Sequence, residues 1–220
     1  QDNRLVQREI CITNGTIEAA MQALNDGISF NIAGGTHHAF SNKPEGFCLL
    51  NDQAIASMHL LNNSLVKKII IIDLDVHQGN GTAEILSNEP RVYTFSMHGE
   101  KNYPLHKPAS DLDISIPDST NDLDYLTILE KNLKEIFNRF QPEFAFYQSG
   151  VDVLKSDKLG RLSLTLEGCK KRDEFVFNIC KENSIPVTTT MGGGYSKDIK
   201  IILDAHCNTF KAGISKHLEA

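Results

Sequence analysis

The sequence predicts a single α/β domain, a three-layer sandwich with a central parallel sheet between two layers of helices. Several segments are continuous apolar runs without polar alternation, which is typical of strands buried on both faces of a parallel sheet. Amphipathic segments lie between most of these runs, and this alternation indicates right-handed βαβ units. The chain has 220 residues, enough for one sizeable core, and no linker or repeat divides it.

The apolar runs give the predicted strands, and the amphipathic segments give the helices. In chain order, the strands are expected at residues 28–33, 66–76, 92–97, 144–148 and 186–190. The clearest helix covers residues 123–140, where apolar residues recur on one face, and it ends before Pro142. The other helices are expected at residues 52–61, where Asn51 is a suitable N-cap, and at residues 166–183 and 197–210. Residues 101–120 are rich in Pro, Asp and Ser and are expected to form a long loop.

Composition excludes some classes of function. The formal net charge of −6 argues against broad nucleic-acid binding, and no apolar run approaches the length of a membrane span. The first eight residues lack the apolar stretch of a signal peptide. The five cysteines contain no C-x-x-C pair, which fits a reducing compartment. We therefore expect a cytoplasmic protein without direct membrane or nucleic-acid partners; nothing in the pattern indicates an oligomeric state.

Polar residues follow the predicted strands at their carboxyl ends, where open α/β sheets bind ligands. Asp73, Asp75 and His77 are spaced by two after the apolar run 69–72, so on a strand they would project to the same face. Buried carboxylates need a metal or a strong partner, and two Asp with one His form a suitable zinc set. The alternative is that the Asp residues cap a following helix and that His77 is an ordinary surface histidine.

Two further segments follow strands and are less specific on their own. His37 and His38 lie after a Gly-Gly turn, where imidazoles suit acid–base catalysis, although adjacent histidines also arise by chance. The segment 192–195 places three glycines before Tyr195. Its glycines would suit either phosphate binding or close approach of the backbone to a site, and the segment by itself favours neither.

Together these segments resemble the histone deacetylase family, which has the arginase/deacetylase-like α/β fold. The matching stretches are GGTHHAFSNKPEGFCLLND (34–52), IIDLDVHQGNGT (71–82), QSGVDVLKSDKLGRLSLT (148–165) and GGGYSKD (192–198). They stand in the order of the family and cover most of the chain from residue 34 onward. The forms DVHQGNG and SMHGEKNYP (96–104) look most like the class IV branch and its bacterial relatives.

The resemblance implies a metal centre. Asp75, His77 and Asp157 match the zinc ligands of the family, and this ligand set would also accept iron(II). Family members hold in addition a structural K⁺ or Na⁺ near the zinc. The positions that match its ligands are Asp73, Asp75, His77 and Ser96.

The resemblance also implies catalytic roles. His37 and His38 match the tandem active-site histidines, with His38 as general base and acid, and Tyr195 matches the tyrosine that binds the carbonyl oxygen. Asp73 matches the carboxylate that orients His37, and Asn80 stands where many members pair the second histidine with Asp. Substrate would be bound by Gly46, Phe47 and Gly193, the first two in the wall of the acyl-lysine tunnel.

The resulting prediction is zinc-dependent hydrolysis of N-acyl-lysine in a protein, or of a small acylated amine such as an acetylpolyamine. A noncatalytic acyl-lysine binding protein is one alternative, and an arginase-like hydrolase with two metals is another. Catalytic domains of this family are longer, and we expect the chain to lack their N-terminal part. Met191 stands where glycine often precedes the Gly-rich segment, a tolerable departure.

Overall fold

The computed structural model describes residues 3–218, which form a parallel six-stranded sheet between two layers of helices. The strand order is β1-β6-β5-β2-β3-β4. The strands are β1 (Ile28–Asn31), β2 (Ile69–Asp73), β3 (Val92–Gly99), β4 (Leu112–Ile116), β5 (Phe144–Gln148) and β6 (Val187–Thr190). The helices are α1 (Asn3–Asp26), α2 (Asp52–Asn62), α3 (Asn80–Leu86), α4 (Asp122–Phe140), α5 (Leu166–Glu182) and α6 (Ile199–Leu218).

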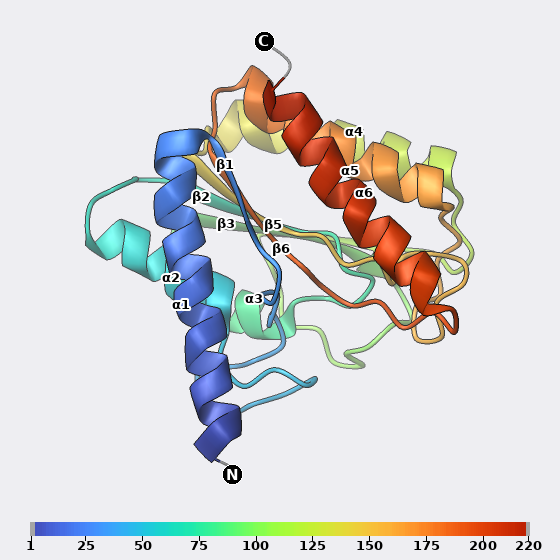
Figure 1. Ribbon diagram of the computed structural model, residues 1–220, viewed down its shortest axis with the longest axis horizontal. Helices are drawn as coiled ribbons and strands as arrows, with labels where there is room; N and C mark the ends of the chain where they lie inside the picture. The colour runs from blue at the N-terminus through green and yellow to red at the C-terminus, as the bar shows by residue number, and fades with distance from the viewer. Residues whose placement is uncertain (1–2, 219–220) are drawn as a thin grey trace.

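The two layers of helices give the sheet two separate apolar cores (Figure 1). Helices α4, α5 and α6 cover one face, where Leu129, Leu133 and Phe177 pack against side chains of the central strands. Helices α1, α2 and α3 cover the other face around Leu60 and Phe146. Every residue of β2 and β5 is buried, which explains their continuous apolar sequences. The predicted three-layer α/β sandwich is confirmed.

Most predicted elements are present with small shifts at their ends. The predicted strand 144–148 coincides with β5, and the predicted strand 66–76 shortens to β2. Asn51 caps α2 as predicted, because its side chain accepts a hydrogen bond from the backbone N–H of Ala54 at 3.0 Å. The C-terminal helix α6 continues beyond the predicted 197–210 to Leu218.

Three elements were not predicted. The sequence did not predict helix α1, because its buried side includes Thr13, Thr16 and Ala20 in place of large apolar residues. Helix α3 is only seven residues long and begins between Gly79 and Gly81, which indicate a loop. Strand β4 falls within the predicted loop 101–120, so that prediction was wrong in part. This strand lies at the edge of the sheet, and its partly exposed alternating sequence lacks the apolar run of a central strand.

The register of the sheet aligns the last residues of four strands with Ser96 inside β3, and this alignment positions the polar residues. Asn31 pairs with Thr190, Thr190 with Gln148, Gln148 with Asp73, and Asp73 with Ser96. Because all strands are parallel, the segments that follow this row leave the same edge of the sheet. Residues far apart in the sequence are therefore brought together beyond it.

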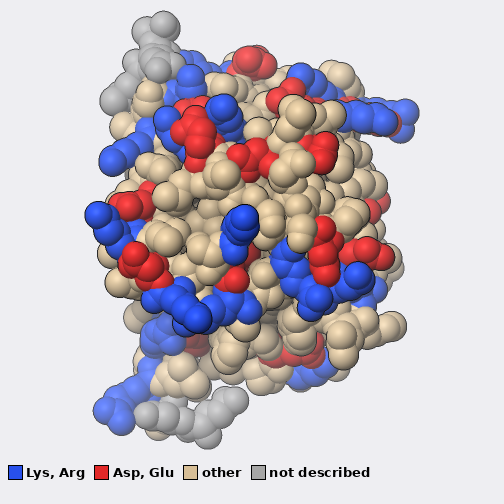
Figure 2. Space-filling model, turned by 90° about the vertical axis from the view of Figure 1, so that its right-hand side faces the viewer, with Lys and Arg blue, Asp and Glu red and all other residues tan. Residues whose placement is uncertain are grey.

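Charged side chains of both signs are mixed over the face that Figure 2 shows, without a continuous patch of one sign. Within residues 3–218, no helix combines the length and the apolar character that a membrane crossing requires.

Candidate metal centre and active site

Three buried side chains beyond the ends of β2 and β5 form a cluster that can hold a metal ion. Asp75, His77 and Asp152 each offer a ligand atom, and these atoms lie within 4.8 Å of one another. Nδ1 of His77 lies 3.1 Å from Oδ1 of Asp75 and 3.1 Å from Oδ2 of Asp152. All three residues are buried. Two carboxylates that converge on one imidazole nitrogen in a buried site form a place where a cation is strongly stabilised.

The pKa shifts of the cluster reflect this concentration of charge. Burial raises the pKa of Asp152 to about 7, and the charge of Asp75 acts in the same direction. Burial lowers the pKa of His77, but its hydrogen bonds to Asp152 and Asp75 outweigh this effect and raise the pKa to about 10. The two carboxylates together therefore favour a positive charge between them. A donor set of two carboxylates and one imidazole fits zinc or iron(II).

The structure places Asp152, and not the predicted ligand Asp157, in the cluster with Asp75 and His77. Asp152 is fully buried and follows β5 after only three residues, so it stays close to the edge of the sheet. The carboxylate of Asp157 instead accepts hydrogen bonds from the backbone N–H groups of Leu159, Gly160 and Tyr195, at 2.8, 2.8 and 2.6 Å. The role of Asp157 in the structure is thus to join two loops at the rim of the site. The family motif contains two Asp residues five positions apart, and spacing alone did not distinguish them.

Backbone contacts hold the two carboxylates of the cluster in place. Asp75 accepts a hydrogen bond from the backbone N–H of Gly193 at 2.7 Å, and Asp152 accepts one from that of Val76 at 2.9 Å. A Cβ atom at Gly150 would lie 2.3 Å from Oδ2 of Asp75, so this position needs glycine to let the loops approach. Gly193 was predicted to bind substrate; in the structure its backbone N–H fixes Asp75.

The tandem histidines lie side by side with different partners. Their ring centroids are 4.0 Å apart. Nδ1 of His37 lies 2.7 Å from Oδ2 of Asp73, and Nδ1 of His38 lies 2.7 Å from Oδ1 of Asn80. The structure thus brings together all four residues, as the resemblance implies.

The two partners give the histidines opposite pKa shifts. Burial lowers the pKa of His37, but the charge of Asp73 and its hydrogen bond outweigh this effect and raise the pKa to about 9. Burial, together with the charge of His37, lowers the pKa of His38 to about 3. At neutral pH the pair therefore combines a cationic His37 with a neutral His38 that can accept a proton.

Two polar side chains that were not predicted hold the loop carrying these histidines. Asp52, at the start of α2, accepts hydrogen bonds from the backbone N–H groups of Gly35 and Thr36. Gln148 donates to the carbonyl of Gly35 at 2.9 Å and accepts from the hydroxyl of Thr190 at 2.8 Å. The sequence signalled Gln148, because a glutamine at the end of an apolar strand needs polar partners. The burial of Asp52 became visible only in the structure.

A cavity of about 730 Å³ lies at the carboxyl edge of the sheet, and Asp73, Asn80, Asp152 and Asp157 are not among its lining residues. The predicted residues that line it are His37, His38, Gly46, Phe47, Asp75, His77, Gly193 and Tyr195. Phe47 is 94% exposed at the cavity, and Tyr195 is 37% exposed. Burial raises the pKa of Tyr195 to about 12, and the charges of Asp75 and Asp152 act in the same direction, so the phenol remains a hydrogen-bond donor.

Arg8 of α1 and Tyr103 also line this cavity, although neither was predicted. The ring of Tyr103 lies edge-on to that of His38, with centroids 5.0 Å apart.

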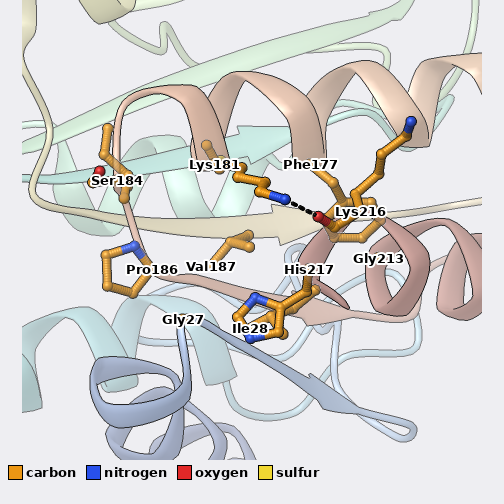
Figure 3. A pocket seen from close by; sticks show the side chains of 12 residues that line it. Gly27, Ile28, Phe177, Lys181, Ser184, Pro186, Val187, Gly213, Lys216 and His217 are labelled. Atoms are coloured by element: carbon orange, nitrogen blue, oxygen red, sulfur yellow. Dashed lines mark hydrogen bonds between the residues drawn. The ribbon is translucent and has the colours of Figure 1, made fainter. Parts of the chain in front are cut away.

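A second cavity of about 260 Å³ lies at the opposite edge of the sheet, where β1 and β6 begin (Figure 3). Its walls include Phe177 and Val187, and Lys181 donates a hydrogen bond to the carbonyl of Lys216 across it at 2.7 Å. Among the residues that the structure describes, no Asp or Glu lines this second cavity. Of the residues in the site, His37, His38, Asp75 and His77 thus line the first cavity and not the second.

The predicted monovalent-cation site remains a prediction. Asp73 and Ser96 lie opposite each other on neighbouring strands. The hydroxyl of Ser96 lies 2.9 Å from Nδ1 of His98, and Oδ1 of Asp73 accepts a hydrogen bond from the backbone N–H of Asp75.

Comparisons with known proteins agree with the fold and with the family that the sequence resembles. Residues 2–209 match the family described as "Histone deacetylase domain". An uncharacterized protein of Picosynechococcus is 44% identical over 202 residues, which cover 92% of this chain and 67% of that protein. Histone deacetylase 2 of Arabidopsis thaliana is 34% identical over 221 residues, and human histone deacetylase 1 is 30% identical over 220 residues. The chain spans 57% and 44%, respectively, of the lengths of these two relatives.

Among solved structures, an acetylpolyamine aminohydrolase from Burkholderia pseudomallei superposes with a TM-score of 0.80 at 21% sequence identity. The match covers 92% of this chain and 61% of the other. This likeness identifies the arginase/deacetylase-like fold.

Proposed function

Since this chain belongs to the histone deacetylase family, we propose that it is a zinc-dependent amidohydrolase that removes the acyl group from N-acyl-lysine. One observation carries the proposal: Asp75 and His77, two members of the buried cluster with Asp152, line the same cavity as a neutral His38 and the phenol of Tyr195. Amide hydrolysis requires an activated water, a base for its proton and a donor for the developing oxyanion.

Asp75, His77 and Asp152 would hold the zinc. The bound metal would polarise the amide carbonyl and lower the pKa of a water molecule toward about 7. His38 takes the proton from the attacking water and returns a proton to the leaving amine, because its lowered pKa keeps it neutral beforehand. His37 stays cationic through its ion pair with Asp73 and stabilises negative charge that develops beside it. Tyr195 donates its phenolic proton to the oxyanion.

The test is hydrolysis of acetyl-lysine peptides by the zinc-loaded protein, before and after removal of the metal with a chelator. We expect turnover that disappears with the chelator and returns with zinc or iron(II). An acetylated diamine, assayed in parallel, separates the two substrate classes: a higher kcat/KM for the diamine would replace the acyl-lysine assignment with a small-amine one. Zinc bound without turnover of either substrate would contradict the proposed hydrolase.

A further inference from the structure

A tight turn at residues 45–48 packs against the ring of His38. Glu45 and Cys48 exchange backbone hydrogen bonds of 3.1 and 2.8 Å, and Gly46 and Phe47 between them have φ angles of 53° and 67°. Two central residues with positive φ define the type I′ turn of a two-residue hairpin. A Cβ atom at Gly46 would lie 2.4 Å from Cδ2 of His38. The position of Glu45 is therefore fixed relative to this histidine.

The carboxylate of Glu45 faces the active site with one oxygen and the surface with the other. Oε1 accepts hydrogen bonds from Nδ2 of Asn80 at 2.8 Å and from the hydroxyl of Tyr103 at 2.6 Å. Oε2 accepts one from Nζ of Lys43 at 2.5 Å. The hydrogen bonds from Lys43 and Tyr103 lower the pKa of Glu45 to about 2, so the group is ionised and can only accept.

This constraint determines which way the amide of Asn80 points. An amide side chain has one end that donates and one that accepts. Because an ionised Glu45 only accepts, Asn80 must turn its NH₂ group toward Glu45 and its Oδ1 toward His38. Nδ1 of His38 lies 2.7 Å from that oxygen and must therefore carry a proton. In a neutral imidazole the other nitrogen, Nε2, is then the acceptor.

Without the carboxylate, nothing in this chain of hydrogen bonds would prefer one orientation of the amide. A flipped Asn80 would present its NH₂ group to Nδ1 of His38, and the proton of a neutral His38 would move to Nε2. In that tautomer Nε2 cannot accept a proton from water. The partly exposed ion pair of Glu45 with Lys43 uses only Oε2, so it does not account for the contact that Oε1 makes with Asn80.

We propose that Glu45 is a positioning residue that sets the tautomer of His38 through Asn80. The effect of Glu45 on catalysis rests on the proposed hydrolysis, whereas the effect of Glu45 on the tautomer of His38 does not. The chain offers a matched control in Glu84, which binds the backbone N–H and hydroxyl of Ser41 in the loop that precedes the turn. Hydrogen bonds from Ser41 anchor this carboxylate away from Asn80 and His38.

The first test reads the tautomer directly, by ¹H–¹⁵N correlation of histidine rings in the full chain loaded with zinc. The signals of His38 are assigned from a His38→Ala variant. We expect the Nδ1–H form in the wild type and in Glu84→Gln, and a shift toward the Nε2–H form in Glu45→Ala. The isosteric Glu45→Gln keeps the turn filled and gives a partial shift, because a glutamine amide can both donate and accept. A His38 that keeps the Nδ1–H form in both Glu45 variants would overturn the proposal.

The second test uses kinetics in two backgrounds. A positioned base contributes about 10²–10⁴-fold to rate, so Glu45→Ala should lower kcat by at least about 10-fold with little change in KM. In an Asn80→Asp background the same substitution should not lower kcat, because a carboxylate at position 80 can only accept from Nδ1 whether or not Glu45 is present, and the loss of Glu45 removes a like charge beside it. An equal loss in both backgrounds would indicate a merely structural role and refute the proposal. If the wild type showed no turnover, that result would contradict the proposed hydrolase activity only. The tautomer measurement would then decide the proposal for Glu45.

Discussion

At the scale of single residues, the sequence shows which types of side chain form the site, but it does not show which of them are hydrogen-bond partners. The pairs His37–Asp73 and His38–Asn80 lie 36 and 42 residues apart along the chain. Their association was predictable only from the family resemblance. Only the structure shows that Asp152, and not Asp157, lies in the cluster. Both residues follow the same buried strand, and they differ in burial and in their hydrogen-bond partners.

Replacement of Asn80 by Asp should change the pH dependence of the reaction. The low pKa of His38 reflects burial and the charge of His37, with only a neutral hydrogen-bond partner to oppose them. An anionic partner stabilises the imidazolium and raises this pKa. Since the base must be unprotonated, the acidic limb of the kcat/KM profile should move to higher pH. A limb at the same or lower pH would show that His38 is not the base.

Loss of the phenol of Tyr195 should act on the transition state. The Tyr195→Phe variant removes one oxyanion donor, and we expect kcat to fall about 10²–10³-fold. Because this side chain is partly exposed, the fold should be retained. Steady-state kinetics with an acetyl-lysine peptide check the prediction, and a KM effect without a kcat effect would place Tyr195 in substrate binding only.

At the scale of elements, helix α5 connects the metal cluster to the core through a buried charge pair. Arg172, fully buried, donates to the carbonyls of Leu74 and Gly150 at 3.1 and 2.7 Å. Its Nε also donates to Asp173 at 2.9 Å, and Thr209 of α6 donates to the same carboxylate at 2.6 Å. Arg172 follows Lys170 and Lys171 in the sequence, and nothing in this charged run indicates that Arg172 alone is buried in an ion pair.

Removal of Arg172 should be strongly destabilising. An Arg172→Met variant leaves Asp173 buried without its charged partner, which costs about 3–5 kcal/mol in the free energy of unfolding. On the same helix, Lys170 forms a partly exposed pair with Glu174, and Lys170→Met should change stability by less than about 0.5 kcal/mol. Urea denaturation of both variants makes the comparison; equal effects would refute the assigned role of Arg172.

At the scale of the whole molecule, the sequence predicted the sandwich well because its central strands are apolar throughout. β2 and β5 could be recognised directly, whereas the edge strand β4 and the polar helix α1 could not, since their buried sides are narrow or lack large apolar groups. The order of the strands brings β2, β5 and β6 side by side. The loops that follow these three strands then meet near the cluster, so the site unites segments that lie far apart in the chain.

Metal binding should therefore stabilise the entire domain. A ligand that binds only the folded state adds about 2.7 kcal/mol at a concentration of 100 times its Kd. Thermal unfolding should occur at higher temperature with zinc than with a chelator, and an Asp75→Asn variant should lose most of this difference. An equal Tm under both conditions would contradict a metal centre that is part of the folded structure.

The central claim is that Asp75, His77 and Asp152 form the metal centre, and zinc titration of two Asp→Asn variants tests it most directly. By isothermal calorimetry, the wild type should bind one zinc per chain. We expect Asp152→Asn to weaken zinc binding by at least about 10-fold, since it removes a proposed ligand. Asp157→Asn should keep both stoichiometry and affinity close to those of the wild type, because its carboxylate holds rim backbone only. The reverse order of effects would contradict the account and return the third ligand to Asp157.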